Sequence, residues 1–359
     1  MKTISLCMIV KNEEDCLANC MESIRNVVDE IIIVDTGSTD GTKEIATKYT
    51  NHIYDFKWCN DFAKARNTAF SKASKDYILW LDADDVLKPE DQEKMLALKE
   101  ELDDSIDVVM LKYNIAFDQN GECTFSYYRE RLVKRSLNLK WQEPVHEYLP
   151  ITGRVVRKEI AITHEKKHSS GDRNLNIYKD RIRRGEKLST RGVYYYAKEL
   201  LEHNNIKDAI KYFEGFLNRE DGWVEDKINA CYYLSKCYRQ INDVEKQQAI
   251  LVKSFEYDIP RAEICCELGL LYFIKMDYKK AIYWYNVAAT LEYPEDNWGF
   301  RIRDSWGYTP NIQLCVCYDR IGNIEQAIKY NEIAAQYKPD SPSVLYNRDY
   351  FKNRQKKEA

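Results

Sequence analysis

The chain has 359 residues, of which 44% are hydrophobic and 31% are charged, and its formal net charge is −4. This length accommodates two domains with separate cores. The small net charge gives no global basic field for nucleic acid or an anionic membrane, so we expect neither as a partner. The apolar runs at 4–10 and 31–34 are too short to span a membrane, and no signal-peptide pattern is present.

In the first half of the chain, short β-rich runs alternate with helical patterns. The runs are continuous in Val, Ile and Leu, which is typical of parallel strands covered on both faces. We expect strands at 3–10, 30–35, 52–56, 77–82 and 108–113. We expect helices at 16–27, 42–48, 62–71 and 89–102. This alternation predicts a doubly wound, mostly parallel α/β sheet that binds its ligand at the carboxyl ends of the strands.

Acidic residues follow two of these expected strands. Asp35 ends the second, and Asp82-Ala83-Asp84-Asp85 follows the fourth. Buried carboxylates need positive compensation, and two of them at alternate positions can hold Mg²⁺ or Mn²⁺ together with substrate phosphates. The plainer interpretation is an acidic loop that caps the helix after Pro89. This motif alone leaves the two interpretations open.

A glycine-containing turn joins the second expected strand to the next helix. It reads Asp-Thr-Gly-Ser-Thr-Asp-Gly-Thr over residues 35–42 and supplies hydrogen-bonding groups at a helix N-terminus. A capped β–α turn accounts for Asp40 but not for Asp35, whose carboxylate can accept a hydrogen bond from a base or ribose. A dinucleotide site is disfavoured, because no GxGxxG follows the first strand.

Five motifs in this order resemble those of family 2 glycosyltransferases with the GT-A fold. The motifs are Ile-Val-Lys-Asn-Glu at 9–13, the turn at 35–42, Trp58 with Asp-Phe-Ala-Lys-Ala-Arg-Asn at 61–67, Leu-Asp-Ala-Asp-Asp at 81–85, and Trp141 with Val-His-Glu at 145–147. The resemblance covers residues 4 to about 165, so we expect a GT-A catalytic domain at residues 1–165.

The resemblance implies how the donor would bind. Asp35 would hold the uracil of a UDP-sugar, and three further residues would surround the nucleoside. They are Val10, Glu13 and Arg66. Asp82 would contact the ribose or, through water, the metal.

It also implies a metal site and a base. Asp82 and Asp84 would form the DxD pair for Mn²⁺ or Mg²⁺, with Asp84 as the direct ligand. His164, which ends a later β-like run, would complete the metal shell. Glu147 would be the catalytic base that takes a proton from the acceptor, with His146 beside it.

Plainer interpretations stay open for several of these residues. Arg66 equally suits an ion pair with a carboxylate at the end of the sheet, and His146 and His164 equally suit structural hydrogen bonds. Asp85 is expected to cap the following helix. The basic stretch 129–135 forms either a wall of the acceptor or phosphate site or a solvated edge strand.

From about Val193 the sequence changes to helices rich in Tyr and Ala. Small residues recur twelve or thirteen positions apart, which indicates helix pairs that stack to share a core. They are found in Tyr196-Ala197 with Ala209, Leu268-Gly269 with Ala281, and Leu314-Cys315 with Ala327. The pattern resembles four tetratricopeptide repeats with an insertion at 295–310. We expect a linker at 166–190 and an all-α repeat domain at 191–359.

The insertion and the cysteines carry further expectations. The insertion contains three aromatic residues that either contact an acceptor or hold neighbouring repeats together: Trp298, Phe300 and Trp306. The cysteines are odd in number, eleven, and none forms a CxxC pair. Most lie in apolar patterns, so we expect reduced thiols and a cytoplasmic protein.

The combined resemblance is to bacterial peptide and protein glycosyltransferases, including glycocin S-glycosyltransferases and flagellin-modifying enzymes. It implies inverting, metal-dependent transfer of a hexose or N-acetylhexosamine from a UDP-sugar to a Ser, Thr or Cys side chain. The repeats would bind the peptide or protein acceptor and could pair two chains into a homodimer. Two alternatives stay open: an acceptor that is a cell-surface polysaccharide or lipid-linked sugar, and an interaction scaffold with an inactive GT-A domain.

Overall fold

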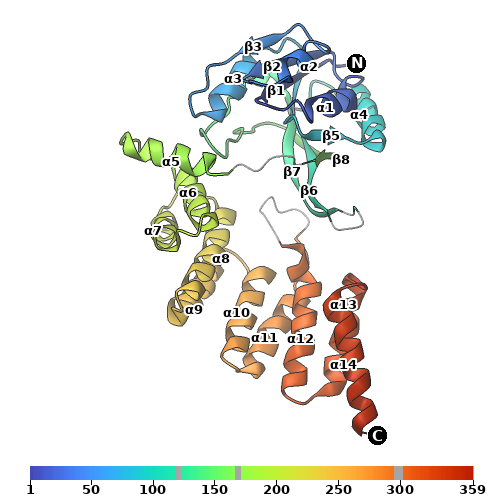
Figure 1. Cartoon of the computed structure of the whole chain (residues 1–359), viewed down its shortest axis with the longest axis vertical. Helices are drawn as coiled ribbons and strands as arrows, with labels where there is room; N and C mark the ends of the chain where they lie inside the picture. The colour runs from blue at the N-terminus through green and yellow to red at the C-terminus, as the bar shows by residue number, and fades with distance from the viewer. Residues whose placement is uncertain (118–120, 122, 166–170, 295–301, 359) are drawn as a thin grey trace. The chain divides into compact units, whose positions relative to one another are not determined.

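The computed structural model divides into two compact units, Met1–Lys187 and Leu188–Ala359 (Figure 1). The described residues are 1–117, 121, 123–165, 171–294 and 302–358. Each unit has its own hydrophobic clusters. The two units are described separately below.

The first unit is built on a mixed sheet. Its strands are β1 (Ile4–Val10), β2 (Glu30–Asp35), β3 (Ile53–Asp55), β4 (Tyr77–Trp80), β5 (Asp85–Leu87), β6 (Val108–Phe117), β7 (Cys123–Lys134) and β8 (Val155–His164). Their order in the sheet is β3-β2-β1-β4-β7-β6-β8-β5. Strands β3, β2, β1 and β4 are parallel, and so are β6 and β8, whereas β7 is antiparallel to both of its neighbours and β5 to β8. The predicted α/β fold class is confirmed.

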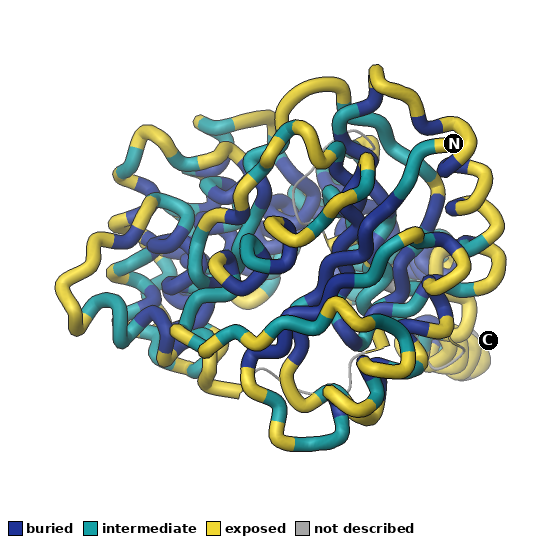
Figure 2. The backbone as a smooth tube through the Cα atoms, turned by 90° about the horizontal axis from the view of Figure 1, so that it is seen from above, coloured by how far each residue is buried: buried dark blue, intermediate teal, exposed yellow. Residues whose placement is uncertain are grey.

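Helices cover both faces of this sheet. They are α1 (Leu17–Ile24), α2 (Thr42–Ala46), α3 (Phe62–Lys72) and α4 (Pro89–Glu101), and a fifth helix of this unit, α5 (Arg173–Arg183), contacts the loop at residues 145–146. Alternate side chains of β1 enter different cores, because successive strand residues point to opposite faces. Leu6 packs in the cluster that contains Met21 of α1, and Cys7 packs in the cluster that contains Phe70 of α3. Strands β1 and β4 are therefore buried along nearly their whole length (Figure 2).

Strand β7 corrects one expectation. The basic stretch 129–135 does not form an edge strand, because β7 lies between β4 and β6. Near the end of β7, Leu132 and Val133 pack in the cores on opposite faces of the sheet, and the side chain of Arg131 is fully buried. The long-range pairing of β6 outside β7 places this arginine in the interior.

The second unit is a stack of antiparallel helix pairs. The helices are α6 (Thr190–Glu202), α7 (Ile206–Leu217), α8 (Val224–Gln240), α9 (Val244–Lys253), α10 (Ala262–Ile274), α11 (Tyr278–Thr290), α12 (Tyr308–Arg320), α13 (Ile324–Tyr337) and α14 (Pro342–Glu358). Consecutive helices pack against each other along the chain (Figure 1). The predicted all-α repeat architecture is confirmed.

The predicted small residues lie where paired helices meet. Ala209, Ala281 and Ala327 are completely buried. A Cβ atom added to Gly269 of α10 would approach the ring of Tyr285 on α11 to 2.6 Å. Only a residue without a side chain therefore allows these two helices their close approach, which explains the glycine in the repeat pattern.

The predicted insertion is only partly described. Residues 295–301, with Trp298 and Phe300, lie outside the described residues. Trp306 is 8% exposed and packs edge-on against Tyr293, with ring centroids 5.3 Å apart. This packing favours the interpretation that Trp306 holds neighbouring repeats together. Pro310 already belongs to α12, so the insertion ends earlier than predicted.

Two other expectations concern the whole chain. All eleven cysteines are free thiols and nine of them are buried, as predicted. Across the described ranges, the helices are too short or too polar to cross a membrane.

Asp226 of α8 makes the stability of the second unit depend on pH. Its side chain is 3% exposed and burial raises its pKa to about 6, although the charges of Arg191 and Lys198 oppose this. The unfolded chain ionises at a lower pH, so stability falls as pH rises from about 4 to about 6 and stays lower above that. Asp226→Asn should stabilise the protein near pH 7 by roughly 2–3 kcal/mol and change little near pH 4.

Thermal unfolding followed by circular dichroism at both pH values measures this effect. Asp349→Asn, the same change at an exposed position of α14, is the control and should leave the unfolding temperature unchanged. An equal effect of Asp226→Asn at both pH values would contradict the explanation.

Candidate active site

A cavity of about 620 Å³ opens in the first unit at the carboxyl ends of β1 and β4. Its wall contains eight of the nine residues that the sequence analysis singled out for binding or catalysis. They are Val10, Glu13, Arg66, Asp82, Asp84, His146, Glu147 and His164. They come from strand ends, from α3 and from the loop before β8, so the fold brings together residues up to 154 positions apart in the chain.

Asp35, the ninth residue, lies just behind this wall, next to Thr36, which does line the cavity. Its side chain is 1% exposed. Asp35 Oδ1 accepts hydrogen bonds from the backbone N–H groups of Gly37 and Ser38, at 2.9 and 3.0 Å. Asp35 Oδ2 is buried and accepts no hydrogen bond from the described residues. A buried carboxylate oxygen of this kind favours a ligand that donates a hydrogen bond.

Arg66 joins two acidic residues of the cavity. Its Nη2 donates to Asp82 Oδ1 at 2.8 Å and its Nε donates to Glu147 Oε1 at 2.7 Å. The guanidinium also contacts two indole rings that pack edge-on against each other, 4.9 Å from the centroid of Trp80 and 5.0 Å from that of Trp141. The side chain of Arg66 is only 9% exposed, so its charge is compensated by these partners rather than by water.

These contacts control the protonation of Asp82. Burial by itself would raise the pKa of Asp82, but the positive charges of Arg66 and Arg131 lower it to about 2. The two carboxylates conversely raise the pKa of Arg66, against the effect of burial. Asp82 is therefore ionised and held in place before any ligand binds.

The loop that carries Glu147 is held by a β-bridge between its two ends and by a tyrosine of α5. Gln142 and Tyr148 form an isolated β-bridge. Between them, His146 has a φ of 53°, in the left-handed region that non-glycine residues seldom adopt. The His146 ring stacks on Tyr178 of α5, and the Tyr178 hydroxyl donates to the carbonyl of Val145 at 3.5 Å. This turn directs Glu147 toward Arg66.

The last two acids of the Asp82–Asp85 motif form a second cluster together with His164. Ligand atoms of Asp84, Asp85 and His164 lie within 4.8 Å of one another, a spacing that suits a metal ion. His164 Nδ1 is 3.4 Å from Asp84 Oδ1 and 3.3 Å from Asp85 Oδ1. Burial would lower the pKa of His164, but its bonds to both carboxylates raise it to about 10.

Asp85 departs from its predicted role. It does not cap the following helix, because α4 begins at Pro89 with Lys88 as its N-cap residue. Asp85 instead starts β5, is completely buried, and forms an ion pair with Arg131 at 3.0 Å. The short strand between the motif and the helix was not visible in the sequence, where three acidic residues before a proline resemble a cap.

Sequence comparison supplies the family of this unit. Residues 5–164 match the family described as Glycosyl transferase family 2. The N-terminal unit is a family 2 glycosyltransferase domain. The match includes every strand of the sheet and each of the nine residues discussed above.

Relatives of this glycosyltransferase domain occur in longer proteins. A TPR repeat-containing protein of Synechococcus elongatus is 36% identical over 148 residues, 41% of this chain and 35% of that protein. The SPbeta prophage-derived glycosyltransferase SunS of Bacillus subtilis is 27% identical over 233 residues, 60% of this chain and 53% of SunS. The matches therefore span about a third and about half of the lengths of these relatives.

Among solved structures, glucosyl-3-phosphoglycerate synthase from Mycobacterium tuberculosis, in complex with Mn²⁺ and UDP-glucose, aligns with a TM-score of 0.37. The two chains are 16% identical, and the alignment covers 53% of this chain and 81% of the synthase. A TM-score this low does not transfer the ligands of that complex to this glycosyltransferase domain.

The sequence analysis missed part of the cavity wall. Arg173 and Asn174, at the start of α5, line the cavity, and the Arg173 guanidinium lies 4.7 Å from the ring centroid of Phe62. Arg129 of β7 was not missed: it lines the cavity, 4.9 Å from the ring centroid of Trp80, in line with the wall interpretation of the basic stretch. The signal for α5 was its apolar spacing, since Leu175 and Tyr178 are buried on one side of the helix.

Removal of the Arg66 side chain should strongly destabilise the glycosyltransferase domain. Arg66→Ala leaves Asp82 and Glu147 without their shared cation in a largely buried site, at an expected cost of roughly 3–5 kcal/mol. Arg66→Lys keeps the positive charge but lacks the planar group that donates to Asp82 and Glu147 at once. Its free energy of unfolding should therefore lie between those of Arg66→Ala and the wild type. Urea denaturation measures the free energy of unfolding.

Arg25→Ala is the control, because Arg25 forms an exposed ion pair with Glu22 at 3.2 Å. Loss of such a surface pair costs about 0–1 kcal/mol. If Arg66→Ala and Arg25→Ala destabilised the protein equally, the bridging role of Arg66 would be wrong.

Proposed function

We propose that this chain is an inverting, divalent-cation-dependent glycosyltransferase that moves a hexose or N-acetylhexosamine from a UDP-sugar to a Ser, Thr or Cys side chain of a peptide or protein. The observation that carries the proposal is that one cavity contains a positioned carboxylate, Glu147, opposite a cluster suited to a cation, Asp84 with His164. The family 2 match of residues 5–164 supports sugar transfer as the reaction type.

The donor's nucleoside is assigned to the β1 and β2 end of the cavity. Asp35 Oδ2, which is buried and lacks a hydrogen-bond partner within the described part of the chain, would accept a hydrogen bond from the uracil N–H. Val10 and Glu13 lie at the same end of the wall. Asp82, fixed by Arg66, is assigned to the ribose or to a water molecule on the cation.

The cation is assigned to Asp84 and His164. Carboxylate oxygen and imidazole nitrogen are ligands that Mn²⁺ accepts, and Mg²⁺ favours the oxygen ligands together with substrate phosphates. The bound cation would offset the negative charge that develops on the departing diphosphate. The residues present therefore fit the ion that the family resemblance implies.

Glu147 is assigned as the general base. Arg66 Nε lies 2.7 Å from Glu147 Oε1 and holds the side chain in the cavity, where the carboxylate can take a proton from an acceptor hydroxyl or thiol. As the proton moves to Glu147, the acceptor oxygen or sulfur forms a bond to the anomeric carbon. The bond from that carbon to the phosphate oxygen breaks, UDP leaves, and the configuration at the anomeric carbon inverts. His146 lies on the same loop, where it is assigned to a hydrogen bond with the acceptor.

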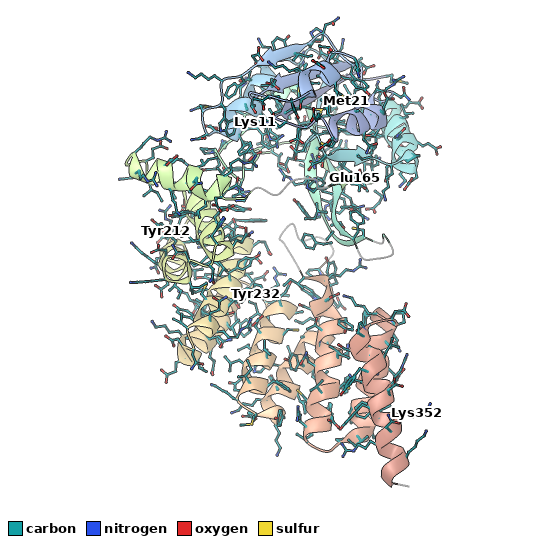
Figure 3. All side chains as sticks on the ribbon, viewed as in Figure 1. Lys11, Met21, Glu165, Tyr212, Tyr232 and Lys352 are labelled. Atoms are coloured by element: carbon teal, nitrogen blue, oxygen red, sulfur yellow. The ribbon has the colours of Figure 1, made fainter. Side chains whose placement is uncertain are left out.

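The acceptor is assigned to the helical repeats, which we expect to pair into a homodimer as well. Tyrosine and lysine side chains occur together on α6 and α8. Lys198 lies 5.4 Å from the ring centroid of Tyr233, and Lys236 lies 4.2 Å from that of Tyr232, which Figure 3 labels. Tyr232 is buried, but Lys198, Tyr233 and Lys236 are partly exposed. Such amphipathic side chains suit a polypeptide, because they offer apolar surface and hydrogen bonds together.

Glu147→Gln tests the assignment of the base. The amide keeps the size of the side chain but cannot take the proton, so the rate of UDP release in the presence of Mn²⁺ and acceptor should fall by roughly 10²–10⁴-fold. Glu101→Gln makes the same change at a residue that pairs with Lys158 on the surface and should keep the full rate. Wild-type turnover by Glu147→Gln would rule out Glu147 as the base.

Mass spectrometry of candidate peptides tests the reaction and the acceptor. Incubation with UDP-hexoses or UDP-N-acetylhexosamines and Mn²⁺ should add one sugar mass to a Ser, Thr or Cys residue. Chelation with EDTA, or the Asp84→Asn substitution, should abolish the added mass because the diphosphate charge is then uncompensated. Transfer to a glycan but to no peptide would support the polysaccharide alternative, and no turnover of any UDP-sugar would support the inactive scaffold.

A further inference from the structure

A buried ion pair lies next to the candidate cation cluster. Asp85 and Arg131 are both 0% exposed, with Arg131 Nη1 3.0 Å from Asp85 Oδ2. The Arg131 guanidinium lies between two rings, 3.9 Å from the centroid of Trp80 and 4.2 Å from that of Tyr113. Burial of two charges costs several kcal/mol per ion, and hydrophobic residues of similar volume often stabilise a fold equally well. The pair therefore suggests a role beyond fold stability.

The two carboxylate oxygens of Asp85 have different partners. Oδ2 faces Arg131 and accepts a hydrogen bond from the backbone N–H of Asp82 at 3.0 Å. Oδ1 lies 3.3 Å from His164 Nδ1. The pairing of β5 with β8 places Asp85 directly opposite His164 in register, so backbone hydrogen bonds fix the distance between the two residues.

These contacts bear on which nitrogen of His164 a cation would use. Nδ1 is within 3.4 Å of an oxygen of Asp84 as well as of Asp85. If Asp84 binds the cation, Asp85 stays as the partner of Nδ1, and Nε2 is the nitrogen left for the cation. Metal-binding histidines generally donate their second ring N–H to a carboxylate or carbonyl, which fixes the tautomer and the ring orientation.

We propose that Arg131 and Asp85 are positioning residues for the cation site: Arg131 holds Asp85, and Asp85 holds His164 in the orientation in which Nε2 binds the ion. Asp85 then acts through His164 and is not itself a ligand. Arg131 also donates from Nη1 to the backbone carbonyl of Trp80 at 3.2 Å, so the same guanidinium fixes the end of β4, just before the acidic motif. This inference rests on the cation dependence proposed above.

The test is Mn²⁺ binding by the full chain without donor or acceptor. Asp85→Asn keeps the shape of the side chain but removes its charge, and should weaken Mn²⁺ binding by roughly 10–100-fold in isothermal calorimetry. Pulsed electron paramagnetic resonance should show coupling of a histidine nitrogen to Mn²⁺ in the wild type, and this coupling should weaken or vanish in Asp85→Asn. A structural role alone would not change that spectroscopic signal.

Asp91→Asn is the matched control. Asp91 is a buried acid of the same domain, 5% exposed, and its carboxylate pairs with Lys94 at 2.8 Å. The same substitution there should leave the Mn²⁺ affinity and the nitrogen coupling unchanged. Unfolding temperatures of both variants separate loss of the fold from loss of the site.

Substitutions of Arg131 test the other half of the pair. Arg131→Lys keeps a positive charge near Asp85 and should retain Mn²⁺ affinity to within a few-fold, whereas Arg131→Met should lose as much as Asp85→Asn. If Arg131→Met does not fold because Asp85 is left unpaired, the double variant Asp85→Asn with Arg131→Met removes both charges. It should fold and bind Mn²⁺ as weakly as Asp85→Asn.

Two results would overturn the inference, and they differ. A folded Asp85→Asn protein with wild-type Mn²⁺ affinity and an unchanged histidine-nitrogen coupling would refute the positioning role alone. A wild-type protein that binds no Mn²⁺ would refute the proposed cation dependence together with it.

Discussion

The geometry of the cavity depends on the placement of Arg66. This residue belongs to α3, yet it binds Asp82 at the end of β4 and Glu147 in the loop before β8. The side chains of Asp82 and Glu147 are 34% and 13% exposed, and the two carboxylates would repel each other without a shared cation. A planar guanidinium presents donors to both carboxylates in a fixed geometry and still contacts the rings of Trp80 and Trp141, whereas the ammonium of lysine is a compact, strongly hydrated point charge.

The acids of the Asp82–Asp85 motif have two kinds of cationic partner. Asp82 pairs with Arg66 and Asp85 pairs with Arg131, and both arginines keep their charge at any physiological pH. Asp84 pairs instead with an imidazole, His164. An imidazole can lose its proton to become a metal ligand, whereas a guanidinium cannot. The fixed pairs on either side thus leave Asp84 as the acid whose partner can be exchanged for a metal ion.

The positions of some site residues could be predicted from the local sequence around them. Val10, Asp35 and Asp82 follow continuous apolar runs, so their positions at the carboxyl edge followed from strand burial alone. The position of β7 did not follow, because the order of strands depends on contacts distant in sequence. Arg131 was for this reason expected either in the wall of the acceptor or phosphate site or on a solvated edge strand, although it is fully buried. Asp85 was misjudged because a three-residue strand has no pattern that separates it from a helix cap.

The cavity also extends beyond the part of the chain that carries the family motifs. The family match ends at residue 164, but α5 supplies Arg173 and Asn174 to the wall. The same helix supports the Glu147 loop, since Tyr178 stacks on His146 and bonds the carbonyl of Val145. The compact first unit accordingly continues to Lys187. A fragment that ended with β8 would keep every motif residue and still lose the support that directs Glu147 toward Arg66, so the motifs alone do not delimit the working site.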